Sequence, residues 1–385
     1  MKYICHYDID NREKRNYFLS AKNKIDYIID CLSSLSLDSI QIISPARTKG
    51  VVYCPQRLVS LSDKVSLKLF RSFGRKNIIT KTLDHFLFPI YLFIYLLKHT
   101  KKDEPVFVYH SLALINTVKF AKLIKKFRLI LEFEEIYSDV TGKKTQRKKE
   151  LNFTKYADGF ILATSLLQEA LNINKKPVVI CNGTYQVEKQ RNLTYREAGE
   201  RENKVIHCVY AGTFDPRKGG CVAAAAAAEF LPANYHIHVI GFGSDKEIEN
   251  IKNFISEIAK KANSTVTFDG LKSGEEYIQF IQSCDIGLST QDPKAAFNAT
   301  SFPSKILSYM SNGLRVVSIR IPAIEQSEVG SCLYYYDKQM PEEIAKAILS
   351  VDLSDKYDGR ALIKNLDLNF RSELQNLLNN VYPNT

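Results

Sequence analysis

Strand-like segments alternate with longer helix-like runs along most of this chain. In the first half the strand-like segments read KYICHY, SIQIIS, VFVYH, RLILEF, GFILAT and VVICN. After a polar stretch at residues 187–204 the alternation restarts with KVIHCVYAG, HIHVIGFG, STVTFDG, DIGLST and LRVVSI. Alternation of this kind is typical of parallel sheets whose strands are joined through helices. The sequence therefore predicts an α/β protein with two doubly wound, Rossmann-like domains.

The chain of 385 residues is too long for a single hydrophobic core. We expect a first domain at residues 1–186, a linker at 187–204, a second domain at 205–360 and a C-terminal helix at 361–385 that packs back on the first domain. Ligands of doubly wound sheets bind at the carboxyl ends of the strands. We therefore expect the two domains to face each other across a cleft.

The composition disfavours several kinds of chemistry. The eight cysteines include no C-x-x-C pair, and several lie in apolar, strand-like runs, as free thiols do in a reducing cytosol. The opening residues, MKYICHYDIDNREKRNY, contain no apolar core of a secretory signal, so we expect a cytoplasmic protein. Neither H-E-x-x-H nor G-x-S-x-G occurs. A catalytic metal, a cofactor and a covalent nucleophile are therefore not expected.

Positive charge is concentrated in the first half of the chain. Residues 1–185 contain 31 Lys and Arg against 17 Asp and Glu, whereas the rest contains 22 against 25. A basic half of this kind suits nucleic acid, an anionic membrane or a phosphorylated substrate. Its basic residues form short clusters outside any recognisable nucleic-acid module, so nucleic acid is the weakest of the three.

One apolar segment favours the membrane. The stretch LDHFLFPIYLFIYLLK, residues 83–98, is nearly continuous in apolar and aromatic side chains and has basic flanks. At this length it is too short to span a bilayer. Two interpretations remain open, namely a buried helix broken near Pro89 and an interfacial helix that docks on anionic lipid, which would make the protein peripheral at the inner face of the plasma membrane.

Three turns in the second half lie where a doubly wound sheet binds its ligands. In VYAGTFDPRKGG a strand ends at Gly212, and Arg217 and Lys218 precede the next helix. Glycine, helix-start amides and an ammonium together suit a diphosphate, although an ordinary β-turn with solvated basic residues is the alternative. The second turn is HVIGFGSD, and the third is TSFPSKILSYMSNGLRVV, a helix entered through Pro303 and followed by a short strand.

In their order and spacing these segments resemble the second domain of glycosyltransferase family 4, enzymes of GT-B fold that transfer a sugar from a nucleotide sugar with retention and usually without a metal. The matching segments are VICNGT, AGTFDPRKGG, VIGFG, FDGLKSGEEYIQFIQSCDIGLST and FPSKILSYMSNGLRVVS. The first domain matches less specifically, but VYHSLALI places His110 at a strand end where the family keeps a histidine near the donor sugar.

The resemblance implies a role for each matching residue. Contacts with the donor diphosphate are expected from Gly212, Thr213, Arg217, Lys218, Ser304, Lys305 and Ile306. Contacts with the nucleoside and sugar are expected from Gly241, Phe242, Thr300, Ser301, Phe302 and Ser308. Lys218 would neutralise the leaving diphosphate. His110 would position the sugar through a neutral hydrogen bond, the alternative being a satisfied core histidine. Hydroxyls at Thr300 and Ser308 replace two glutamates that many members carry, and Thr213 replaces an arginine.

Acceptor contacts are expected in the first domain. Arg12, Lys14 and Arg15 stand where the family commonly has a glycine-rich loop, and they suit an anionic acceptor. Glu134 and Glu135 follow a strand and are further candidates, although they would equally satisfy the basic residues 143–149 or helix-start amides.

The resemblance implies a retaining transfer from a nucleoside diphosphate sugar, with UDP-sugar favoured over GDP-sugar. The expected acceptor is lipid-linked or a polysaccharide, in bacterial surface polysaccharide biosynthesis. The alternative is a non-catalytic GT-B partner that binds nucleotide or glycan and assists another transferase.

Overall fold

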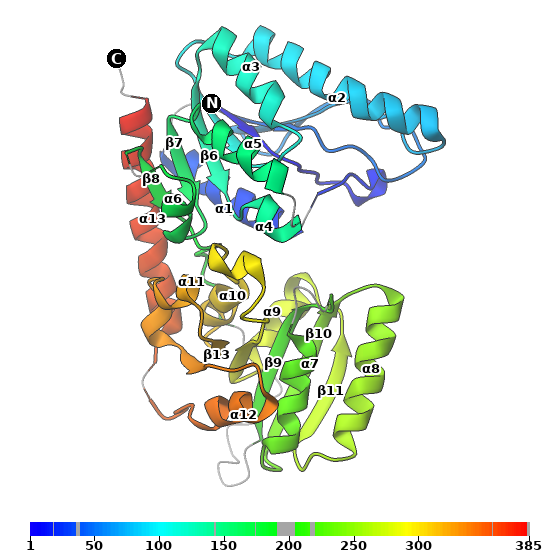
Figure 1. The fold of residues 1–385 in the computed structure, drawn as a ribbon, viewed down its shortest axis with the longest axis vertical. Helices are drawn as coiled ribbons and strands as arrows, with labels where there is room; N and C mark the ends of the chain where they lie inside the picture. Colours follow the sequence, from blue (N-terminus) through cyan, green and yellow to red (C-terminus); the bar gives the residue numbers. More distant parts are fainter. Residues whose placement is uncertain are drawn as a thin grey trace. The chain divides into compact units, whose positions relative to one another are not determined.

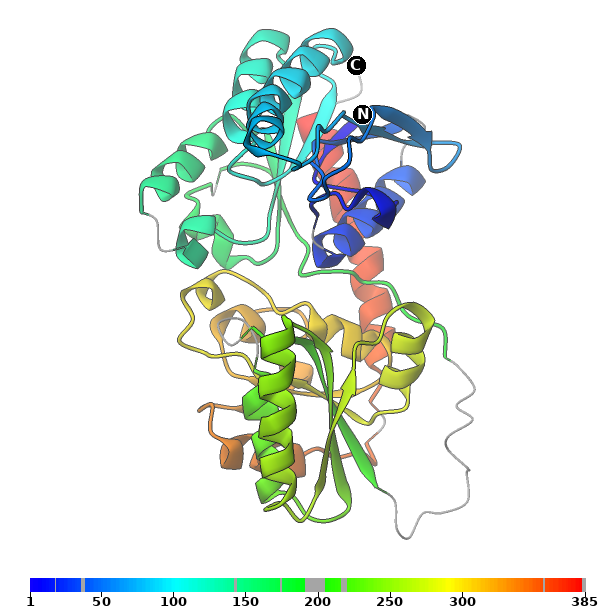
Figure 2. The ribbon, with the colours of Figure 1, turned by 90° about the vertical axis from the view of Figure 1, so that its right-hand side faces the viewer.

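The computed structural model describes residues 1–17, 19–35, 39–141, 144–173, 175–190, 205–215, 220–355 and 357–382. The chain divides into two compact units, one of Met1–Cys181 with Asn369–Thr385 and the other of Asn182–Leu368. Each unit is a β-sheet with helices packed against it (Figures 1 and 2). The predicted pair of parallel-sheet α/β domains is confirmed. Most of the predicted linker, residues 191–204, lies outside the described residues.

The sheet of the first unit has eight strands in the order β3-β4-β2-β1-β5-β6-β7-β8. The strands are β1 (Lys2–Ile4), β2 (Ile40–Ser44), β3 (Arg57–Ser60), β4 (Val65–Leu69), β5 (Pro105–Tyr109), β6 (Arg128–Phe133), β7 (Gly159–Leu162) and β8 (Val178–Ile180). All neighbours pair in parallel except the edge strand β3, which is antiparallel to β4. Central strands such as β5 are buried on both faces, as continuous apolar runs in parallel sheets predict.

Helices and short 3-10 turns connect these strands. They are η1 (Asn11–Glu13), α1 (Leu19–Leu35), α2 (Ile78–His99), α3 (Ile115–Lys125), α4 (Tyr137–Thr141), α5 (Lys144–Thr154) and α6 (Leu166–Ala170). The last helix, α13 (Gly359–Val381), contributes its residues from Asn369 onward to the first unit. There Phe370 stacks on Tyr27 of α1 with ring centroids 5.6 Å apart, and Arg371 Nη2 lies 2.9 Å from Asp30 Oδ2.

Helix α2 corrects one expectation from the sequence. The helix is continuous through Pro89 and is 22 residues long, beginning five residues before the apolar segment. A capping box at Asn77 and Thr80 stabilises its start. Six of its apolar side chains are exposed, and Phe86 is 66% exposed, so the interpretation as a buried, broken helix is wrong. By length and composition alone α2 is also sufficient to cross a membrane, although a single helix of this kind is weak evidence.

The sheet of the second unit has six parallel strands in the order β11-β10-β9-β12-β13-β14. The strands are β9 (Ile206–Thr213), β10 (Tyr235–Phe242), β11 (Thr265–Gly270), β12 (Ile286–Ser289), β13 (Arg315–Ile319) and β14 (Tyr334–Tyr336). The connecting helices are α7 (Cys221–Ala226), η2 (Ala227–Phe230), α8 (Asp245–Ala259), α9 (Gly274–Gln282), η3 (Ala296–Ala299), α10 (Lys305–Ser311), α11 (Pro322–Glu325), η4 (Gly330–Cys332) and α12 (Pro341–Leu349).

Small residues allow helices to lie close to this sheet. Five alanines of α7 and η2, residues 224–228, are buried. A Cβ added at Gly287 in β12 would lie 2.3 Å from the ring of Tyr309 in α10. Glycine is therefore required here because the tyrosine ring already fills the space above the strand.

We predict that Gly287→Ala lowers the free energy of unfolding of the second unit by about 1–3 kcal/mol, the range for overpacking a filled core. The midpoint of urea unfolding, followed by circular dichroism, measures the change. Gly50→Ala is the matched control, because its Cβ would meet only the Thr48 hydroxyl, at 3.2 Å. Equal midpoints for both variants would contradict the packing of α10 against β12.

Candidate functional site

The carboxyl ends of β9 and β10 bring two of the predicted turns together. In the parallel register Gly212 pairs with Gly241, and Thr213 pairs with Phe242. Gly241 has a φ of +147°, and a Cβ on it would lie 1.8 Å from the Gly212 carbonyl oxygen. A side chain is excluded at this point. The two turns, 29 residues apart in the sequence, therefore form one continuous edge of exposed backbone.

Lys305, a half-buried residue of α10, places its ammonium group beside this edge. Lys305 Nζ is 4.0 Å from the ring centroid of Tyr210, and a Cβ on Gly212 would be 2.8 Å from the same nitrogen. Among the described residues no carboxylate pairs with this ammonium. Burial lowers the pKa of Lys305 to about 8. A desolvated cation without a counter-ion, next to two glycines, is the arrangement expected of an anion site.

Tyr210 connects this ammonium to the first turn. Its hydroxyl donates to the Thr213 carbonyl oxygen at 3.0 Å and accepts from the Gly220 amide at 3.2 Å. A Cβ on Gly220 would lie 1.6 Å from the Thr290 carbonyl oxygen, which fixes the point where the chain re-enters helix α7. Arg217 and Lys218, the cations predicted for the diphosphate, lie outside the described residues.

The start of α10 differs in part from the expectation. The Ile306 amide donates to the Pro303 carbonyl oxygen at 3.1 Å, so it is already satisfied and is not free for a phosphate. Ser304 is exposed and precedes the helix without capping it through its side chain. Lys305 is thus placed to act through its ammonium group, which lies beside the glycine turns.

The residues predicted for the nucleoside and sugar differ in exposure. Thr300 and Phe302 are buried, Ser301 is half-buried, and Phe242 is 59% exposed. The Ser308 hydroxyl lies 3.1 Å from the Tyr277 hydroxyl. Tyr277 is a residue that sequence reasoning missed, although it lies within the matched segment that includes α9.

His110, in the first unit, lies in a buried network. Its Nε2 is 2.8 Å from Glu150 Oε1, and its ring stacks on Phe133 with centroids 3.9 Å apart. Glu150 also accepts from the amides of Tyr137 and Ser138, at 2.9 and 3.1 Å. Burial lowers the pKa of His110, which favours the neutral form of the ring, and Glu150 opposes this shift. Its Nδ1 has no partner among the described residues, so the ring is only half satisfied.

Glu150 was not among the predicted site residues. It directly follows the basic residues 143–149 in the sequence and lies in α5. Its neighbours in the sequence, Lys149 and Leu151, do not indicate that Glu150 is buried. Only the fold brings it to His110, 40 residues away in the sequence.

The predicted acidic residues have partners other than those proposed. Glu134 forms an ion pair with Lys24, a buried residue of α1 that also donates to the Cys181 carbonyl oxygen at 2.7 Å. Neighbouring Glu135 is half-buried. Glu132 accepts a hydrogen bond from Tyr3, and burial raises the pKa of Glu132 to about 8. Among the described residues, Glu134 is therefore held by Lys24.

The basic acceptor candidates separate into two kinds. Arg15 is a correction to the prediction. Its side chain is fully buried and donates to Glu13 and to the carbonyl oxygens of Ala46 and Phe70, so it is structural and offers no surface to an acceptor. Arg12 is exposed and forms a bidentate pair with Asp10, while Lys14 is exposed.

Comparison with known proteins gives a family match for part of the second unit and structural matches for nearly the whole chain. Residues 206–352 match the family model for glycosyl transferases group 1. No curated protein sequence matches the chain. Three of the similar solved structures are as follows. One, described as trehalose-6-phosphate from E. coli bound with UDP-2-fluoro glucose, has a TM-score of 0.67 and 11% identity, covering 100% of this chain and 99% of that one.

The second is sucrose-phosphate synthase from Thermosynechococcus elongatus, with a TM-score of 0.63, 14% identity and coverage of 98% and 94%. The third is Anabaena HepE in complex with UDP and glucose, with a TM-score of 0.64, 12% identity and coverage of 98% of each chain. At these identities the likeness shows the fold, which is GT-B over nearly the whole chain. The matched family domain contains Gly212, Gly241 and Lys305. Residues 206–352 therefore match the glycosyl transferases group 1, and the chain has the GT-B fold of the similar structures.

Proposed function

We propose that this chain is a retaining transferase of family 4 type that takes its sugar from a nucleoside diphosphate sugar, with UDP-sugar as the favoured donor. The observation that carries the proposal is the Lys305 ammonium beside the joined turns at Gly212 and Gly241, which forms no ion pair with a described residue. Support for UDP comes from the similar structures, two of which hold a UDP compound.

In this proposal the second unit stabilises the leaving group. Breaking the bond between sugar and diphosphate increases the negative charge on the diphosphate, and a preorganised cation lowers the energy of that state. Lys305 supplies one such cation and Lys218 a second. Retention proceeds on a single face of the sugar, without a protein nucleophile or a metal. The hydroxyls of Thr300 and Ser308 contact the sugar and ribose where relatives use carboxylates.

The acceptor is proposed to be lipid-linked or a polysaccharide, in the synthesis of a bacterial surface polysaccharide at the inner face of the plasma membrane. Two packed helices of the first unit, α2 and α3, support a membrane location (Figure 1). Their exposed apolar side chains are Ile78, Ile79, Leu83, Phe86, Ile90 and Ile94 on α2, and Phe120, Leu123 and Ile124 on α3. Exposed apolar side chains on adjacent basic helices are typical of an interfacial surface.

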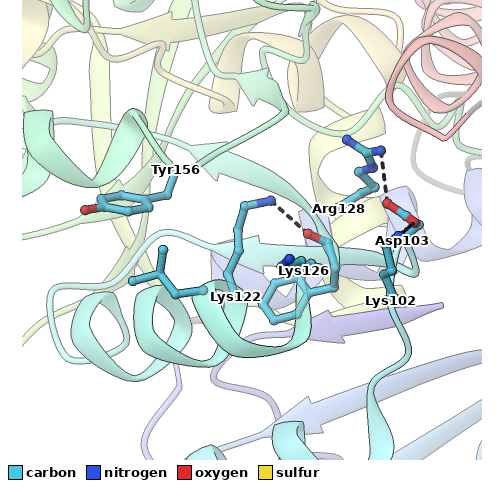
Figure 3. A pocket seen from close by; sticks show the side chains of 8 residues that line it. Lys102, Asp103, Lys122, Lys126, Arg128 and Tyr156 are labelled. Carbon is cyan, nitrogen blue, oxygen red and sulfur yellow. Dashed lines mark hydrogen bonds and ion pairs between the residues drawn. The ribbon is translucent and has the colours of Figure 1, made fainter.

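A basic pocket at the end of α3 adds to this surface (Figure 3). The pocket has a volume of about 450 Å³ and is lined by Lys102, Asp103, Lys122, Leu123, Lys126, Phe127, Arg128 and Tyr156. Asp103 pairs with Arg128 at 3.0 Å, and Lys122 pairs with Asp158 at 2.5 Å. Lys126 forms no ion pair with any described residue. An anionic lipid headgroup matches the remaining positive charge.

The first test of the proposal concerns the charge of Lys305. The affinity for UDP is expected to fall as pH rises above about 8, by up to roughly tenfold per pH unit, because the deprotonated amine no longer attracts the diphosphate. Lys305→Met removes this pH dependence and weakens binding at pH 7 by roughly tenfold to a hundredfold, the equivalent of about 1.5–3 kcal/mol for a charged hydrogen bond. Isothermal titration calorimetry at several pH values measures both effects.

Lys261→Met, at an exposed position beyond α8, is the matched control for this titration and should retain wild-type affinity. An unchanged affinity in Lys305→Met would remove Lys305 from the donor site. Absence of binding to every nucleotide would contradict the function itself. If UDP binds but no donor sugar is transferred, and Lys218→Ala leaves the basal release of UDP unchanged, the chain is instead a non-catalytic partner of another transferase.

The second test concerns the membrane. The double variant Phe86→Glu with Ile90→Glu is expected to reduce co-sedimentation with anionic vesicles at least tenfold, because burial of each apolar side chain contributes about 1.5–3 kcal/mol. Binding is also expected to be weaker for neutral vesicles and at high salt. Leu58→Glu, at an exposed apolar position of β3, is the control. Equal binding of wild type and double variant would contradict docking through α2.

The third test concerns His110, which we propose positions the donor sugar. Burial lowers the pKa of His110, and the hydrogen bond and negative charge of Glu150 partly offset this decrease. Glu150→Gln removes the negative charge and is therefore expected to lower the pKa of His110 below its value in the wild type. An NMR titration of the imidazole measures this pKa. The acid limb of the pH–rate profile should move in the same direction. Glu169→Gln, at an exposed site on α6, should change neither quantity, and an unmoved pKa in Glu150→Gln would show that the pair does not tune the ring.

A further inference from the structure

Three of the seven histidines lie together on one face of the second sheet. His207 in β9 pairs in register with His236 in β10, and His238 follows two residues later on the same side of its strand. One nitrogen from each ring lies within 4.8 Å of the others. The rings of His236 and His238 are stacked with centroids 3.8 Å apart, and His207 Nδ1 is 2.9 Å from His238 Nε2. The pairing of β9 with β10 thus brings three potential ligand atoms close to one another.

Hydrogen bonds with β11 orient two of the rings. Asp269 Oδ2 lies 3.1 Å from His238 Nδ1 and accepts from the Thr267 hydroxyl at 2.7 Å. An ionised carboxylate only accepts, so His238 carries its proton on Nδ1 and its lone pair on Nε2. The Thr267 hydroxyl donates to Asp269 and therefore accepts from His236 Nε2, 2.9 Å away. This bond leaves the lone pair of His236 on Nδ1.

The carboxylate behind His238 is the feature that distinguishes this cluster from a chance group of histidines. Metal-bound histidines usually donate their second ring nitrogen to a carboxylate or carbonyl, which fixes the tautomer and increases the basicity of the ligand. Phe280 of α9 packs edge-on against the His238 ring, with centroids 5.3 Å apart. The cluster is therefore partly shielded from water, as a structural metal site requires.

We propose that His207, His236 and His238 bind one divalent transition-metal ion of the Zn²⁺ class, with Asp269 orienting His238. Neutral imidazoles suit Zn²⁺, which takes nitrogen ligands at about 2.0–2.1 Å in a tetrahedral arrangement that leaves its fourth position here to water. The three nitrogens need to close to separations of about 3.4 Å, the distance implied by that geometry. Without metal, His207 Nδ1 donates its proton to the lone pair of His238 Nε2. When the metal binds, this proton leaves Nδ1 and His207 becomes protonated on Nε2, so that the lone pairs of His207 Nδ1 and His238 Nε2 both face the metal.

This ion has a structural role and is distinct from the transfer reaction. His207 is the second residue of β9, whereas Gly212 and Thr213 end the same strand. At roughly 3.3 Å per residue, His207 lies about 16 Å from Gly212 along β9, and His238 lies about 10 Å from Gly241 along β10. The site joins β9 to β10, with β11 supplying Asp269, so it stabilises the strands that carry the donor turns (Figure 1).

The test is metal binding by the full-length protein after treatment with a chelator. Titration with Zn²⁺ is expected to show one saturable site, and Co²⁺ is expected to give the visible spectrum of a tetrahedral nitrogen-ligated ion. Zn²⁺ should also raise Tm. Asp269→Asn is expected to weaken Zn²⁺ binding roughly tenfold to a hundredfold, the usual effect of removing a partner behind a metal ligand. His238→Gln should weaken it further.

His99→Gln, at an exposed histidine in α2, is the matched control and should bind Zn²⁺ as the wild type does. The Tm of each variant without metal shows whether the variant is folded. If His238→Gln does not fold, Asp269→Asn still tests the site, because this variant keeps all three histidine ligands. Absence of a saturable site would overturn the proposal. Wild-type affinity in a folded His238→Gln, or in Asp269→Asn, would do the same. A thiolate charge-transfer band with Co²⁺ would assign the ion to a cysteine and would also exclude the histidine site.

Discussion

The close approach of β9 and β10 at their carboxyl ends is the constraint on which the candidate donor site depends. Only glycine allows the backbone of residue 241 to lie against the carbonyl group of residue 212. The same end of β9 is held to α10, because the Tyr309 hydroxyl accepts from the Ala211 amide at 2.8 Å. That bond sets α10 against the sheet and places Lys305 next to Gly212. The close strand pairing and the cation are therefore parts of one arrangement.

Buried charge has different partners in the two units. In the first unit, buried ionisable groups pair with one another, as His110 does with Glu150 and Lys24 with Glu134. Paired groups offset their loss of hydration and hold neighbouring elements in place. In the second unit Lys305 has no carboxylate partner among the described residues. An ammonium in such a position is stabilised by a bound anion, such as the diphosphate proposed for this site.

The surface of the first unit gives a physical meaning to the uneven charge of the chain. The basic first half contains α2 and α3 with their exposed apolar side chains, and several of its cations line the pocket near Lys126. Helix α2 continues through Pro89, since a proline removes one amide donor but the remaining turns and the packing of Leu92 and Leu96 maintain the helix. The outer face of α2 is left without a partner in the described structure.

The sequence by itself determined the secondary-structure alternation, the two parallel sheets and the order of the glycine turns, because these follow from local periodicity and from backbone positions that only glycine can occupy. Tertiary structure alone decided which side chains meet. Lys305 reaches a turn more than 90 residues earlier, Glu150 reaches His110, and Arg15 is buried although it lies in a basic cluster. Such contacts depend on strand order and register, which join distant parts of the chain and leave no periodic signal in the sequence.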